Sequence, residues 1–263
     1  MGQTNKRMPA AFIGHGTPLN ALRTNRWTEA WRQLGRELAR PRSTLVVSGH
    51  WCTDGSAVTA MPRPPTIHEL YGFPSELHQF SYPAPGDPKL AARVRMLLEP
   101  LPVHLDHSWG LDHGAWSVLS KMFPSADIPV VQLSIDMAQP ARRHYEIGQR
   151  LRPLRDEGVL VLGSGNVVHN LGGRARHQQQ FAHVAGRRPA DLIAYETFGA
   201  DALLAVPPPD HYYPLLYVVG AGGDDEVSIE IDGIERGAIS MLSVLYGQKL
   251  VQPAPHLMAD VLV

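Results

Sequence analysis

Short apolar runs rich in β-branched residues alternate with helix-like segments along this chain of 263 residues. Turn-forming residues flank the runs, which is typical of buried strands that end in tight turns. A sheet-edge strand is expected at Val227–Ile231, where apolar and polar residues alternate, with a helix after it. The other predicted strands are Ala10–Ile13, Thr44–Ser48, Val103–Leu105, Val130–Ile135, Val159–Leu162 and Leu215–Val219.

The segments between these runs predict helices. Arg26–Ala39 follows the possible cap residues Thr24 and Asn25, and Pro88–Leu98 begins with a proline suited to a first helical turn. Further helices are expected at Arg142–Asp156, Ala115–Phe123 and Ala190–Leu204. This alternation favours an α/β fold in which helices cover both faces of a sheet. The length suits one domain over residues 1–263.

The stretch Met61–Pro88 is rich in proline and aromatic residues. Proline fixes φ and removes a hydrogen-bond donor, so this stretch is neither a central strand nor a helix interior. Its aromatic residues are costly to expose to water, which favours a segment that packs on the rest of the protein. They are Tyr71, Phe73, Phe80 and Tyr82. We expect an ordered loop that covers either the mouth of a binding site or an edge of the core.

Four histidines lie beside a strand-like run or a turn: His15, His50, His169 and His211. Imidazole is the commonest protein ligand for transition metals, and strand ends bring distant residues together in an α/β fold. The four histidines therefore predict a metal site. A single histidine in such a place is more often a hydrogen-bonded structural residue, and the chain has 13 histidines in all.

Composition restricts the partners. The formal net charge is −1 and the basic residues are scattered, which argues against nucleic-acid binding. The single cysteine, Cys52, excludes an intramolecular disulfide, and no long apolar stretch predicts a signal peptide or a membrane span. We expect a cytoplasmic protein without a membrane partner. The sequence predicts no particular oligomeric state.

Taken together, eight motifs spread over nearly the whole chain resemble the DOPA-type extradiol dioxygenases. These enzymes belong to the LigB superfamily of class III extradiol ring-cleavage dioxygenases. The motifs are GHGTP (Gly14–Pro18), SGHW (Ser48–Trp51), TIHELYGFP (Thr66–Pro74), YPAPGDP (Tyr82–Pro88), WGLDHG (Trp109–Gly114), VQLSID (Val131–Asp136), GSGNVVHNL (Gly163–Leu171) and HYYPLLYVVGA (His211–Ala221).

The resemblance implies a single three-layer αβα domain around a mixed, mainly parallel sheet. It places the metal at His15, His50, His169 and His211, and a substrate-side histidine at His113. Protocatechuate-type members of the superfamily have a glutamate where this chain has His211, as DOPA-type members do. The interval between His169 and His211 is shorter than in close bacterial DOPA-type proteins, which bears on the substrate.

The implied reaction inserts O2 into a catechol ring and gives a ring-opened muconate semialdehyde. Its metal is divalent: zinc readily occupies an all-histidine site, whereas oxygen activation ordinarily uses ferrous iron. His169 is either a fourth ligand or the general base that takes the catechol proton. His113 is a second acid–base group or a hydrogen-bond donor to the substrate, and His68 is a weaker candidate for substrate contact.

Two other functions remain open from the sequence. One is a zinc-dependent hydrolase on the same scaffold, in which the metal activates water and His113 or His169 carries the proton. The other is a binding protein that the metal stabilises but that catalyses nothing, since a fold alone does not determine function.

Overall fold

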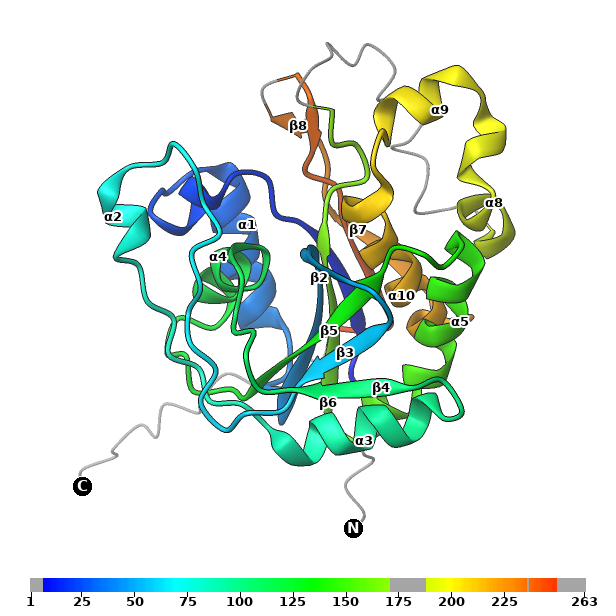
Figure 1. Ribbon diagram of the computed structural model, residues 1–263. Coiled ribbons are helices and arrows are strands. Elements are labelled where there is room, and N and C mark those ends of the chain that lie inside the picture. The colour runs from blue at the N-terminus through cyan, green and yellow to red at the C-terminus, as the bar shows by residue number, and fades with distance from the viewer. Residues whose placement is uncertain (1–6, 171–187, 236, 250–263) are drawn as a thin grey trace, which may run out of the picture.

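The computed structural model describes residues 7–170, 188–235 and 237–249, and these form a sheet with helices on both faces (Figure 1). The strand order across the eight-stranded sheet is β4-β3-β5-β2-β6-β1-β10-β7. Its strands are β1 (Ala10–Gly14), β2 (Ser43–Thr53), β3 (Ser56–Thr59), β4 (Val103–Asp106), β5 (Val130–Asp136), β6 (Val159–Gly165), β7 (Val227–Ile231) and β10 (Ser243–Tyr246). A separate ribbon consists of β8 (Ile234–Glu235) and β9 (Ile239–Ser240).

The sheet is mixed and mainly parallel, as predicted. Its central strands β5, β2, β6 and β1 pair in parallel, and every residue of β1, β5 and β6 is buried. Antiparallel pairing occurs between β3 and β5, and between β10 and both β1 and β7. The parallel core brings the carboxyl ends of β1, β2 and β6 to one edge of the sheet, which is where ligand sites form in folds of this kind.

Two apolar cores, one on each face, hold the three layers together. Ala10 and Phe12 of β1 lie in the first core and Ala11 and Ile13 in the second, because successive strand residues point to opposite faces. The helices α3 (Pro88–Leu98), α5 (Ala141–Leu151) and α10 (Tyr213–Gly222) pack into the first core, and α1 (Arg26–Glu37) and α4 (His113–Met122) into the second (Figure 1).

The structure defines where two of the predicted helices begin and end. Asn25 rather than Thr24 caps α1, because the Asn25 side chain accepts hydrogen bonds from two backbone N–H groups of the first turn. The predicted helix at Arg142–Asp156 is interrupted before Pro153.

The remaining helical segments of the described chain are short. They are α2 (Ser75–His78), α6 (Pro153–Asp156), α8 (Pro189–Ile193), α9 (Ala200–Ala205), η1 (Pro18–Ala21), η3 (Tyr195–Phe198) and η4 (Pro209–His211).

The strand predicted at Leu215–Val219 is wrong, because these residues form the middle of α10. Every residue of α10 is buried, so the segment has no polar face to distinguish a buried helix from a buried strand. Helices α5 and α10 cross at very close range. A Cβ atom added at Gly148 would lie 2.2 Å from the carbonyl oxygen of Tyr217.

The carboxyl-terminal part differs further from the prediction. The strand at Val227–Ile231 is confirmed, but β8, β9 and β10 follow it instead of a helix. The segment predicted as one helix at Ala190–Leu204 is divided into α8, η3 and α9, with Gly199 at φ +90° between the last two. The sequence also did not predict β3, a strand of only four residues.

The Met61–Pro88 segment is irregular apart from α2 and an isolated bridge, in agreement with the predicted loop. Tyr82 is buried, and its hydroxyl donates a hydrogen bond of 2.9 Å to the carbonyl oxygen of Phe123. Tyr71, in contrast, is 94% exposed, so the expectation that it packs was wrong.

The described helices include none that is both long and apolar enough to cross a membrane.

The buried His144 on α5 predicts a pH-dependent stability. Burial lowers its pKa from 6.5 to about 4, although Asp136 and the carbonyl oxygen of Gln139 favour the charged ring. The unfolded chain therefore binds a proton at higher pH than the folded chain does, and stability is lost as the pH falls from 6.5 toward 4. At pH 5 this effect is expected to lower the free energy of unfolding by about 2 kcal/mol relative to its value near pH 7.

Replacing His144 by phenylalanine tests this prediction. Urea unfolding at pH 7.5 and pH 5 should show a smaller difference in unfolding free energy for the variant than for the wild type. Subtracting the pH-dependent change of the variant from that of the wild type removes the contributions of the other histidines. An equal pH dependence in both proteins would contradict the assignment.

Candidate functional site

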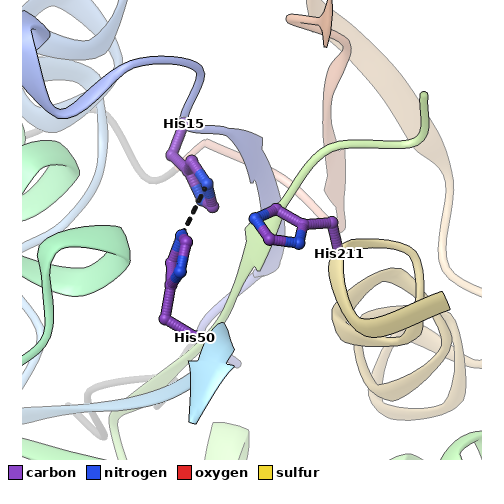
Figure 2. A group of neighbouring side chains, drawn as sticks. All are labelled: His15, His50 and His211. Atoms are coloured by element: carbon purple, nitrogen blue, oxygen red, sulfur yellow. Dashed lines mark hydrogen bonds between the residues drawn. The ribbon is translucent and has the colours of Figure 1, made fainter. Parts of the chain in front are cut away.

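Three histidines meet at the edge of the sheet where β1, β2 and β6 end (Figure 2). His15 directly follows β1, His50 lies near the end of β2, and His211 ends η4 just before α10. His15 and His211 are buried, and His50 is half-buried. Neighbouring strands and the start of one helix thus bring together side chains that are far apart in sequence.

The spacing of the ring nitrogens fits ligation of one cation. One nitrogen from each of His15, His50 and His211 lies within 4.8 Å of the other two. The Nε2 atoms of His15 and His50 are 3.2 Å apart. Two imidazole nitrogens that bind the same zinc ion in tetrahedral geometry are separated by about 3.3 Å. The three rings therefore have the arrangement that a shared metal ion requires.

A serine on β6 fixes the tautomer of His15. The hydroxyl of Ser164 donates its proton to the carbonyl oxygen of Gly114 over 2.7 Å. Its 3.0 Å contact with His15 Nδ1 must therefore be a hydrogen bond that the imidazole donates. Nδ1 of His15 then carries the proton, and the lone pair of Nε2 faces His50. Such a partner on the far nitrogen is typical of a histidine that binds metal.

The electrostatics also favour neutral rings. Burial lowers the pKa of His15 and of His50 well below the ordinary value, and the neighbouring histidines lower both further. Both ring nitrogens of His211 are buried and have no hydrogen-bond partner among the described residues. Nδ1 lies 3.1 Å from a carboxylate oxygen of Asp210 outside hydrogen-bonding geometry. Neutral imidazoles with available lone pairs are the donors that a divalent transition metal needs, so these residues fit such an ion.

His169, the fourth predicted ligand, lies beside this group. Its ring stacks on that of His211, with centroids 3.9 Å apart and an interplanar angle of 4°. The described three-histidine group within 4.8 Å does not include it. Burial, followed by the effect of His211, lowers the pKa of His169 to about 4. The side chain is therefore neutral near pH 7.

His113 also packs against this group, and its partner, Glu69, was not predicted from the sequence. The ring centroid of His113 is 3.7 Å from that of His50. Glu69 Oε1 accepts hydrogen bonds from His113 Nδ1 at 2.6 Å and from its backbone N–H at 2.9 Å. Burial opposes ionisation of Glu69, but the hydrogen bonds from His113 outweigh it and lower the carboxyl pKa.

The relation of this chain to known proteins agrees with the site. Residues 10–231 match the family described as the catalytic LigB subunit of aromatic ring-opening dioxygenase. The chain belongs to the LigB family. It is 47% identical over 262 residues to an Escherichia coli K12 protein named 4,5-DOPA dioxygenase extradiol, covering 93% of this chain and 96% of that protein. A Beta vulgaris protein of the same name is 38% identical over 244 residues, covering 86% of this chain and 91% of that protein.

Solved structures show the same relation. A crystal structure of an uncharacterized protein from Escherichia coli K12 superposes with a TM-score of 0.78 at 44% identity. The match covers 92% of this chain and all of that one. This LigB chain is accordingly an extradiol ring-opening dioxygenase with the αβα fold predicted from its sequence.

Polar residues behind the histidines hold the LigB site in place. Asp112 is fully buried and caps α4 through Ala115 N–H. Its carboxylate also accepts hydrogen bonds from Ser48 Oγ at 2.7 Å and from Gln132 Nε2 at 2.6 Å. Burial raises the pKa of Asp112. These hydrogen bonds fix the start of α4 and with it the position of His113.

Asn166 and His68 contact the site indirectly. Asn166 donates its backbone N–H to the carbonyl oxygen of His211 and its side-chain amide to Ser240, so it positions the segment that carries a histidine. His68 points back into its own loop, where Nε2 lies 2.8 Å from the carbonyl oxygen of Phe80. The histidine thus helps to hold the loop, and its neighbour Glu69 is the residue that reaches His113.

Proposed function

We propose that this LigB chain cleaves the ring of a DOPA-like catechol beside its two hydroxyl groups, at a divalent metal held by His15, His50 and His211. The observation that carries the proposal is the convergence of three imidazole nitrogens, with two further histidines, His113 and His169, packed against the group. The names of the Escherichia coli and Beta vulgaris relatives support DOPA as the substrate. Both oxygen atoms enter the product, a muconate semialdehyde.

Ferrous iron is the proposed catalytic metal, and zinc is an ion that the same donors bind without turnover. A bound divalent cation supplies a positive charge that lowers the pKa of catechol, and ferrous iron adds the redox activity that oxygen requires. Three neutral ligands leave the whole charge of the cation available to the catecholate.

The chain's own residues would orient the catechol and move its protons. Glu69 occupies Nδ1 of His113, which leaves Nε2 as the ring atom that faces the substrate. His113 then holds a catechol oxygen by a hydrogen bond. His169 is neutral near pH 7 and takes the proton of the second hydroxyl group, returning it when the ring opens. This base role is the one we adopt for His169, in place of a fourth ligand.

Removing the Glu69 carboxylate should reduce turnover without removing the metal. Glu69→Ala frees Nδ1 of His113 and leaves the ring without a fixed orientation, so kcat should fall about 10- to 100-fold. Glu69→Gln retains an acceptor oxygen and should lose less. Kinetics with bound-metal analysis check this, with the exposed Glu76→Ala as the control from the same loop. A Glu69→Ala variant with wild-type kcat would overturn the role.

The proposed reaction is tested by the product spectrum. Metal-free protein loaded anaerobically with ferrous iron, and separately with zinc, is given L-DOPA, caffeate and protocatechuate in aerated buffer. A yellow ring-opened product from L-DOPA with iron alone is expected. Oxygen-independent hydrolysis of esters or amides by the zinc protein would instead favour the hydrolase. No turnover with any metal, together with a lower melting temperature after chelation, would favour the binding protein.

The remaining parts of the proposal concern the substrate, the cellular compartment and the domain organisation. The substrate is a small catechol together with O2, and the single cysteine suits the reducing cytoplasm. We also propose that residues 1–263 act as one catalytic domain, since both apolar cores contain residues from the beginning and the end of the described chain.

A further inference from the structure

Glu235 places a carboxylate next to Gly16, the residue after His15, and none of the described residues supplies it with a counter-charge. Its Oε2 atom is buried and has no hydrogen-bond partner. A Cβ atom added at Gly16 would lie 2.7 Å from that oxygen, so the carboxylate packs against the residue that follows His15. Buried polar atoms in folded proteins nearly always have a partner, so an unpaired carboxylate oxygen needs an explanation.

The strand register places Glu235 on the same side as His169. Glu235 lies opposite Ile239 in the β8–β9 ribbon, and Ile239 lies opposite His169 in an isolated bridge. Directly opposed residues of an antiparallel pair project to the same face, so all three side chains share one. Two strand spacings separate Glu235 from His169, about 10 Å. The His169 ring in turn stacks on His211.

The other acidic side chains of the site already accept hydrogen bonds. Glu69 accepts two hydrogen bonds from His113, and Asp210 accepts one from the backbone N–H of His211. The ion pairs of the described residues include none to Glu235. The negative charge of Glu235 is therefore available for a cationic group that arrives with the substrate.

We propose that Glu235 binds the protonated amine of an amino-bearing catechol and makes the enzyme selective for that class of substrate. The inference rests on the proposed function, because the histidines must hold the catechol end. In this arrangement the catechol ring lies at the histidines and the two-carbon side chain carries the ammonium group toward Glu235. A charge-assisted hydrogen bond between ammonium and carboxylate then supplies the missing partner of Oε2.

Matched substrates test the selectivity. Dopamine and L-DOPA carry the amine, whereas 4-methylcatechol lacks it. In Glu235→Gln, kcat/KM should fall about tenfold or more for both amines, while 4-methylcatechol should change by less than about twofold. The exposed Glu99→Gln at the end of α3 is the control, with no expected change for any substrate. An equal loss for all three substrates, or no loss for the amines, would overturn the proposal.

A binding experiment separates this proposal from ring cleavage. Tyramine and 4-methylphenol differ in one aminomethyl group and have no second hydroxyl group to react. Calorimetry on metal-loaded protein should show tyramine binding about tenfold tighter than 4-methylphenol to the wild type, and equally to Glu235→Gln. Equal binding of both compounds by the wild type would refute the amine site whether or not the enzyme cleaves catechols. Turnover of 4-methylcatechol by the wild type tests the proposed function on its own.

Discussion

His15→Ala is expected to bind its metal at least about 100-fold more weakly and to lose ring cleavage to at least the same extent. The reason is geometric: His15 Nε2 lies 3.2 Å from His50 Nε2, and Ser164 holds the proton on the other nitrogen of His15. Removing the ring leaves two of the three nitrogens and an unfilled volume between them. Metal content after dialysis and the rate of product formation measure the two losses.

The control for this substitution is His107→Ala. His107 is exposed and lies outside the described histidine group, so its replacement should leave metal content and turnover unchanged. His50→Ala and His211→Ala should behave as His15→Ala does. Full metal content and activity in His15→Ala would contradict the ligand assignment.

His169→Gln is expected to keep the metal and to lower kcat by about 10²- to 10⁴-fold, the usual contribution of a general acid–base group. The expectation follows from a neutral ring that stacks on His211 and stands outside the three-histidine group. Glutamine fills a similar volume but does not take up a proton. Steady-state kinetics and metal analysis of the same preparation measure both quantities.

The metal analysis distinguishes the two roles predicted for His169. A His169→Gln variant that loses metal in parallel with kcat would show that the residue is a fourth ligand, and the base role would be wrong. The exposed His78→Gln is the control and should match the wild type in both measurements.

The sequence predicted the parts of the fold that depend on strand ends. The apolar runs before His15 and His50 are central parallel strands, and such strands end at the same edge of a sheet. His211 was also found, although the run after it is α10 and not a strand. A fully buried helix and a buried strand show the same unbroken apolar pattern, so periodicity does not separate them.

Glu69 and Glu235 show what the sequence did not provide. Glu69 lies in an irregular loop, where no periodicity indicates the direction of a side chain, and its contact with His113 joins residues 44 apart. Glu235 lies in a two-residue strand whose place depends on pairing with β9. Both positions follow from long-range packing. The signal that was available for Glu69 is its position next to His68 in the TIHELYGFP motif.

The most direct test of the central claim is the ratio of oxygen consumed to catechol consumed. An oxygen electrode, with L-DOPA followed in parallel by chromatography, measures it on protein loaded with ferrous iron. Ring cleavage requires one O2 for each catechol and no hydrogen peroxide, with His15→Ala inactive under the same conditions. Catechol loss without oxygen uptake, or uptake with peroxide and an intact ring in the product, would contradict the proposed dioxygenase.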